Sequence, residues 1–76
     1  MTPRLPALKP KDVLRALQKA GFFVQHATGS HRYLKHPDKP QLRVTVPYHN
    51  RDLKRGTLHS IIKQSGIPLD EFLSLL

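Results

Sequence analysis

The chain contains no cysteine, which excludes disulfide bridges and thiolate metal sites. It has only five acidic residues, too few and too scattered to supply the ligands of a two-metal nuclease centre. No apolar run approaches the roughly 18–20 residues of a membrane span, and residues 1–10 contain no signal-peptide core, so we expect a cytoplasmic protein. A chain of 76 residues without disulfide bridges or a thiolate-bound metal ion must build its core from regular helices and strands. We therefore expect one domain over residues 1–76.

Positive charge dominates what is present. The chain has 13 lysines and arginines, and its formal net charge is +8 with histidine counted as neutral. The cations are concentrated before Gly56, whereas the remaining residues carry Lys63 against Asp70 and Glu71. Such clustering of positive charge indicates a polyanionic partner. Nucleic acid is the preferred candidate, and an acidic protein surface is the second. A basic face that only keeps the protein soluble is the alternative.

Helical patterns occur at both ends of the chain. Residues 1–8 contain two prolines and predict an extended arm, whereas residues 10–20 place apolar side chains on one helical face and precede Gly21, a typical helix terminator. A second helix is predicted from Gly56 or the next residue to about Ser65. A short third helix is predicted to open at Pro68.

The middle of the chain has strand character. Residues 22–27, 31–36 and 42–46 are the predicted strands, and residues 28–30 and 38–40 are the predicted turns. The resulting order is α-β-β-β-α with a short C-terminal helix. This order predicts an α+β fold in which a three-stranded antiparallel sheet packs both long helices on one face. The other face of the sheet would then be open to a partner.

The first hairpin decides which side chains reach that open face. If residues 28–30 form a three-residue loop, the predicted cross-strand pairs are Ala27 with His31, Gln25 with Tyr33, and Val24 with Leu34. Val24 and Leu34 would face the core, and the outward side chains would be those of His31, Tyr33, Lys35, Arg43 and Thr45. A two-residue turn would shift the register by one and reverse the assignment.

His31 is the strongest candidate for chemistry, because an imidazole exchanges protons near neutral pH and can act as a general base. From the residues alone, a polar hairpin residue is the more common role of a single histidine. His31 and His36 are an odd number of positions apart on one strand, so they point to opposite faces. We therefore expect no metal site and no cofactor. His26, His36 and His59 belong to no recognisable catalytic or metal-binding motif and are interpreted as surface or packing residues.

A second candidate is the basic run of residues 47–56, which leads into a predicted helix N-terminus where backbone N–H groups accept phosphate. An ordinary exposed loop explains this composition equally well. The chain has no glycine-rich phosphate loop, no paired carboxylates and no Ser-His-Asp arrangement.

An ordered set of short motifs resembles the HicA-like (YcfA family) mRNA interferase toxins over nearly the whole chain. The matching segments are Leu5-Pro6, Lys11-Asp12-Val13, Leu17, Gly21-Phe22, Gly29-Ser30-His31, Arg43-Val44-Thr45-Val46-Pro47, His49, Gly56-Thr57-Leu58 and Ile61-Ile62-Lys63-Gln64-Ser65-Gly66-Ile67. The resemblance departs from the family at Arg32, where some relatives carry a second histidine, and at Pro68, where relatives often have serine.

The resemblance implies a double-stranded-RNA-binding-domain-like fold and a ribonuclease that cleaves mRNA with the histidine of the Gly-Ser-His motif, here His31. It also implies a HicB-like antitoxin that covers the active face, with the toxin monomeric when free and hetero-oligomeric with its antitoxin. The substrate would be single-stranded RNA, because in-line attack by a ribose 2′-OH needs a flexible backbone. The candidate RNA contacts are Ser30, Arg32, Tyr33, Lys35, Arg43, His49, Lys54 and Arg55.

Two alternatives remain at this level. The chain could be a non-catalytic RNA-binding module of the same fold, in which His31 is structural. It could also be a basic subunit whose only partner is an acidic protein, which predicts no RNA affinity at any salt concentration.

Overall fold

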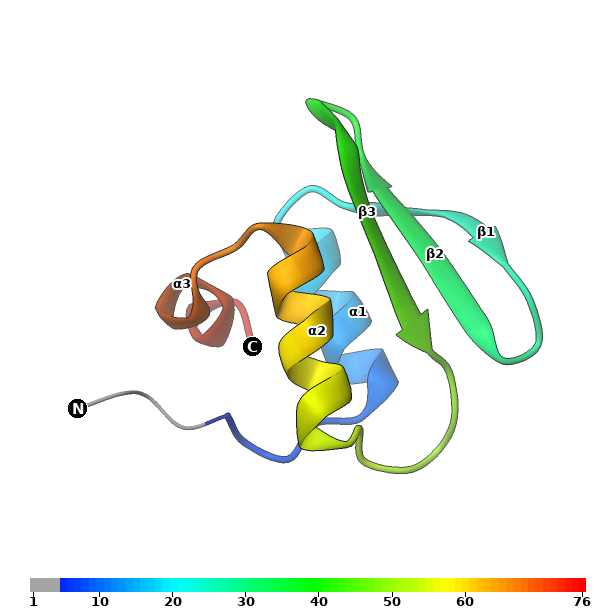
Figure 1. Ribbon diagram of the computed structural model, residues 1–76, viewed down its shortest axis with the longest axis vertical. Coiled ribbons are helices and arrows are strands. Elements are labelled where there is room, and N and C mark those ends of the chain that lie inside the picture. The colour runs from blue at the N-terminus through cyan, green and yellow to red at the C-terminus, as the bar shows by residue number, and fades with distance from the viewer. Residues whose placement is uncertain (1–4) are drawn as a thin grey trace.

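Three antiparallel strands follow the first helix, and two further helices follow the strands (Figure 1). The computed structural model describes residues 5–76, so the first half of the predicted arm lies outside the described residues. The elements are α1 (Pro10–Lys19), β1 (Phe23–Ala27), β2 (His31–His36), β3 (Lys39–Pro47), α2 (Arg55–Ser65) and α3 (Leu69–Ser74). The strands form one sheet in the order β1-β2-β3. The predicted α+β fold is confirmed.

The ends of α1 agree with the sequence pattern. Pro10 occupies the first turn, and the backbone N–H of Lys9 donates to a carboxylate oxygen of Asp12 at 3.0 Å. The helix ends before Gly21, whose φ of +101° is a conformation that favours glycine. Val13 and Leu17 lie on the inner face of α1 and are fully buried. These contacts fix α1 against the sheet.

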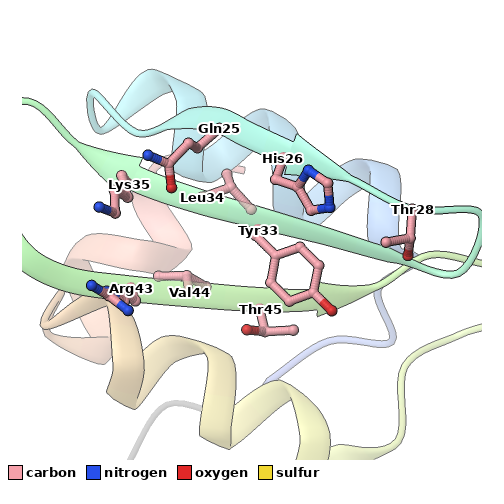
Figure 2. A pocket seen from close by; sticks show the side chains of 9 residues that line it. All are labelled: Gln25, His26, Thr28, Tyr33, Leu34, Lys35, Arg43, Val44 and Thr45. Carbon is pink, nitrogen blue, oxygen red and sulfur yellow. The ribbon is translucent and has the colours of Figure 1, made fainter.

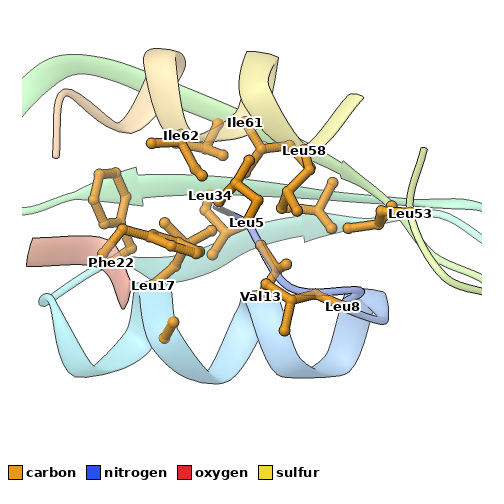
Figure 3. Close-up of a cluster of buried hydrophobic side chains, with 14 residues drawn as sticks. Leu5, Leu8, Val13, Leu17, Phe22, Leu34, Leu53, Leu58, Ile61 and Ile62 are labelled. Atoms are coloured by element: carbon orange, nitrogen blue, oxygen red, sulfur yellow. The ribbon is translucent and has the colours of Figure 1, made fainter. Parts of the chain in front are cut away.

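Helix α2 covers the same face of the sheet as α1. It begins at Arg55, one residue before the predicted start, and ends at Ser65, which is followed by Gly66 with a φ of +71°. Its buried residues Ile61 and Ile62 pack toward α1 across the core (Figure 3). The helix is also tied to the edge of the sheet, because the backbone N–H of Thr45 donates to Oε1 of Gln64 at 3.0 Å.

The core is completed from both ends of the described chain. Leu5 and Leu8 are buried in it, and the backbone N–H of Leu53 donates to the carbonyl oxygen of Leu8 at 2.7 Å. The predicted arm therefore packs onto the fold from Leu5 onward, although residues 5–9 have no regular secondary structure. Phe72 of α3 is fully buried in the same cluster.

Strand β3 is longer than predicted. The expected turn at residues 38–40 is wrong, because Lys39 already pairs with His36 and the connection is Pro37-Asp38. The backbone N–H of Asp38 donates to Nδ1 of His36 at 3.1 Å, which supports this tighter turn. The register then shifts so that Lys35 pairs with Arg43. The alternation over residues 42–46 is as predicted, with Val44 and Val46 buried.

The predicted register of the first hairpin is wrong near its turn. The backbone N–H of Thr28 donates to the carbonyl oxygen of His31 at 2.9 Å, which closes a tight turn with Gly29 and Ser30 as its two central residues. Observed pairs near the turn are Ala27 with Arg32 and His26 with Tyr33, instead of Ala27 with His31 and Gln25 with Tyr33. A bulge at Gln25 then restores the predicted pairing of Val24 with Leu34.

The outward orientation of His31 and Tyr33 nevertheless holds. Leu34 is 1% exposed and faces the helices, so the alternation along β2 turns Tyr33 to the opposite side, and His31 with it. The shorter turn does not reverse the assignment, because the bulge lies in β1 and leaves β2 regular. Burial of Leu34, rather than the length of the turn, sets the faces of β2.

Gly21 gives a test of how α1 joins the sheet. A Cβ atom there would lie 2.6 Å from Nε2 of His36, which is itself 3.0 Å from the carbonyl oxygen of Ala20. We expect Gly21→Ala to lower the free energy of unfolding by about 1–3 kcal/mol, because the positive φ and the contact both oppose a side chain. Urea unfolding followed by circular dichroism measures this.

The matched control is Gly56→Ala. A Cβ atom at Gly56 meets nothing within 4 Å, and this residue lies inside α2. Alanine there should stabilise the protein by up to about 1 kcal/mol. Equal unfolding midpoints for the two variants would contradict the account of Gly21.

Candidate nucleic-acid interface

The face of the sheet opposite α1 and α2, here called the open face, carries polar, aromatic and basic side chains (Figure 2). It holds a shallow hollow of about 540 Å³. The lining residues are Gln25, His26, Thr28, Tyr33, Leu34, Lys35, Arg43, Val44 and Thr45. No residue of strands 23–27, 31–36 and 39–47 is acidic. This face therefore presents cations without acidic neighbours on the sheet.

Three rings gather on the open face and form what we call the aromatic cluster: His26, Tyr33 and His31. The ring centroids of His26 and Tyr33 are 5.6 Å apart with an interplanar angle of 28°, and those of His31 and Tyr33 are 6.1 Å apart with an angle of 26°. Tyr33 is 37% exposed, and His26 is exposed as well. Each histidine ring is thus within 28° of parallel to the Tyr33 ring, and none of the three is buried.

The sequence analysis missed His26 as a member of this cluster. It paired Gln25 with Tyr33, whereas the bulge at Gln25 puts His26 opposite Tyr33. Nothing in the composition of residues 22–27 marks a bulge at that position. A two-residue turn at Gly29-Ser30 would have predicted it, because that turn shifts the register by one and pairs His26 with Tyr33.

His31 is held by its own hairpin. Its backbone N–H donates to Oγ1 of Thr28 at 3.0 Å, and its Nδ1 lies 3.1 Å from Oγ of Ser30. The second contact orients the imidazole ring. In the tautomer that donates from Nδ1 to Oγ, the lone pair of Nε2 is free to accept a proton. Ser30 therefore lies where a positioning partner of His31 is needed.

Lys35 and Arg43 are direct cross-strand partners on the open face. Like charges placed opposite each other destabilise a sheet unless an anion lies between them. The pair lies next to the Tyr33–Thr45 pair, one step further along the same face. These two cations are thus suited to bind a phosphate beside the aromatic cluster.

Arg32 points to the other side of β2. Its guanidinium carbon lies 4.0 Å from the centroid of the Tyr48 ring, and its Nη1 donates to the carbonyl oxygens of Thr28 and His31. Tyr48 in turn donates its backbone N–H to the carbonyl oxygen of Ser30 at 2.8 Å. These contacts fasten the hairpin turn to the segment after β3, so Arg32 supports the position of His31 from behind.

The remaining predicted contacts follow β3 or begin α2. Lys54 precedes α2, and Arg55 borders a separate hollow beside residues 5–7. His49 lies in the loop after β3, where its Nδ1 accepts the backbone N–H of Arg51 at 3.0 Å. None of these three lines the hollow on the open face.

Over residues 5–76, no three histidine, cysteine or acidic side chains come together as a metal centre would require. Within that same range, no helix combines the length and apolarity needed to cross a membrane.

Comparison with known proteins bears on the family. No curated protein matches the chain. The family model described as the HicA toxin of bacterial toxin–antitoxin systems matches residues 10–67. The matched region runs from α1 through all three strands to the end of α2, and it includes the Gly29-Ser30-His31 turn. Because it covers more than half of the sequence, the chain belongs to the HicA toxin family.

Proposed function

We propose that the protein is an endoribonuclease that cleaves mRNA without a metal ion and uses His31 as general acid and base. Toxins of this family are generally ribonucleases. The observation that carries the proposal for this chain is the contact between Nδ1 of His31 and Oγ of Ser30 at 3.1 Å, on a face that also presents Lys35 and Arg43. An oriented imidazole beside two cations is suited to act on a phosphodiester.

In the proposed reaction, Nε2 of His31 takes the proton of a ribose 2′-OH, and the 2′ oxygen attacks the adjacent phosphorus. The bond from phosphorus to the 5′ oxygen breaks as the new bond forms. The imidazolium then returns its proton to the leaving 5′ oxygen. The products are a 2′,3′-cyclic phosphate and a 5′-hydroxyl end, and no water or metal ion enters this step.

The cations have a separate role in the proposal. Lys35 and Arg43 stabilise the charge that develops on the phosphate oxygens, or hold a neighbouring phosphate in place. Contacts outside the open face would be made to flanking parts of a longer RNA by His49, Lys54 and Arg55. The substrate is single-stranded, because a duplex restrains the backbone from the in-line geometry.

The partner of a toxin in such a pair is an antitoxin. We propose that a HicB-like antitoxin covers the open face in the cytoplasm and competes there with RNA. The basic face favours an acidic surface on this partner. The free toxin would be a monomer, and its hetero-oligomer with the antitoxin would be inactive.

The His31→Ala variant tests the chemistry. We expect it to lower the cleavage rate of an end-labelled transcript by about 10²–10⁴-fold, since the proton acceptor is lost. RNA affinity, measured by filter binding, should change little. His59→Ala, an exposed histidine on α2, is the matched control and should cleave like the wild type.

Equal cleavage by the wild type and the His31→Ala variant would refute the catalytic role. Wild-type protein that binds RNA and never cuts it would favour the non-catalytic RNA-binding module of the same fold.

Removal of metal ions provides an independent test. Cleavage by the wild type should proceed at the same rate with excess EDTA, because the proposed step needs no divalent cation. Gel analysis of the products measures this. Activity that disappears in EDTA and returns with added Mg²⁺ would contradict the mechanism.

A further inference from the structure

We propose that the aromatic cluster of His26, Tyr33 and His31 is a base-stacking platform that positions a nucleotide of single-stranded RNA beside the cleaved bond. The proposal rests on the proposed function for its substrate and adds a role for two side chains, His26 and Tyr33, that perform no proton transfer. It assigns His26 to RNA binding, whereas the sequence alone indicated only a surface or packing residue.

The first support is the geometry of the rings. The plane of the Tyr33 ring lies at 28° to that of His26 and at 26° to that of His31, with centroid separations of 5.6 and 6.1 Å. These separations exceed the about 3.5–4 Å at which carbon atoms of superposed rings make contact, so the rings are not closely superposed on one another. Each ring can then present part of its face to a flat ligand. A nucleobase is such a ligand, and all four bases have a π face.

The second support is exposure. Cross-strand aromatic pairs can stabilise a sheet without any ligand, so a base can stack on these rings only where they are accessible. Here Tyr33 is 37% exposed and lines the hollow on the open face with His26 (Figure 2). Aromatic side chains on an open sheet face are the means by which other small domains stack the bases of single-stranded RNA.

The third support is the order of groups along β2. His31, Tyr33 and Lys35 alternate with core-facing residues, so neighbouring members are about 7 Å apart along the strand. Lys35 is opposite Arg43, and Tyr33 is opposite Thr45. The strand thus presents a proton acceptor, then stacking rings, then a pair of cations. A nucleotide stacked at Tyr33 would have His31 on one side and Lys35 with Arg43 on the other.

Charge favours RNA as the occupant. The two opposed cations have no acidic residue on any of the three strands to offset them. An apolar protein surface would leave them unpaired, whereas a phosphate next to the stacked base would pair with them. The combination of stacking rings and backbone cations is the pattern of sequence-tolerant binding to single strands.

The experiment uses short single-stranded RNAs that are 2′-O-methylated throughout, so that the 2′ oxygen cannot attack and binding is separated from cleavage. Each RNA carries 2-aminopurine at one position, and stacking on an aromatic ring quenches its fluorescence. The protein contains no tryptophan, so its own emission does not obscure this signal. We expect the wild type to quench the probe strongly at one or two positions.

Substitutions identify the rings responsible. Tyr33→Leu should abolish the quenching and weaken RNA binding by about tenfold to a hundredfold, while Tyr33→Phe should retain both. His26→Ala, at an exposed position of the edge strand, should weaken binding in the same direction, and His59→Ala should have no effect. Circular dichroism verifies the fold of each variant, and His26→Ala keeps the test decisive if Tyr33→Leu does not fold.

Unchanged quenching and affinity in folded Tyr33→Leu or His26→Ala would overturn the platform, as would a wild type that does not quench the probe at any position. These outcomes are distinct from failure of the proposed function. A wild type that quenches the probe but cuts no unmodified RNA would refute the ribonuclease and leave the platform standing. If the wild type cuts RNA and the folded Tyr33→Leu variant shows unchanged quenching and affinity, the platform is refuted and the ribonuclease stands.

Discussion

One-sided burial of the three-stranded sheet is the constraint on which the rest of the structure depends. Leu34, Val44 and Val46 are almost completely buried beneath α1 and α2. Because side chains alternate along a strand, burial of these residues turns Tyr33, Lys35 and Arg43 to the other face. The open face is thus a consequence of how the core is made, and it carries the polar and basic residues on which the proposed function rests.

The hairpin and its support place His31 at one end of this face. Hydrogen bonds within the Thr28–His31 turn hold the backbone, and Ser30 orients the ring. Behind the turn, Arg32 packs on Tyr48 and donates to two carbonyl oxygens of the hairpin. Arg32 occupies the position where some relatives carry a second histidine. In this chain the residue supports the turn, and the second imidazole of the open face comes from His26 on β1.

The sequence was sufficient to predict what depends on periodicity. Helical spacing, Gly21 and Gly66 predicted the helices to within about one residue of where they lie. The outward face of His31 was predicted from a three-residue loop that the structure does not have, and the alternation around buried Leu34 gives the same face. The pairing next to the turn could not be predicted from periodicity, because the bulge at Gln25 depends on how β1 and β2 pair in the folded sheet. The same holds for Arg32, since only the folded chain brings Tyr48 beneath its guanidinium. Lys54 and Arg55 were grouped with His31 by charge, which does not specify a face.

The central claim is that RNA binds the open face of the sheet. Mapping of backbone amide chemical shifts by NMR, with a 2′-O-methylated single-stranded RNA added to the wild type, tests it most directly. The account predicts that the largest shifts lie at His26, His31, Tyr33, Lys35 and Arg43, and that the amides of α3 change little. Shifts confined to α2, α3 and the segment around Lys54, with β2 unaffected, would contradict it.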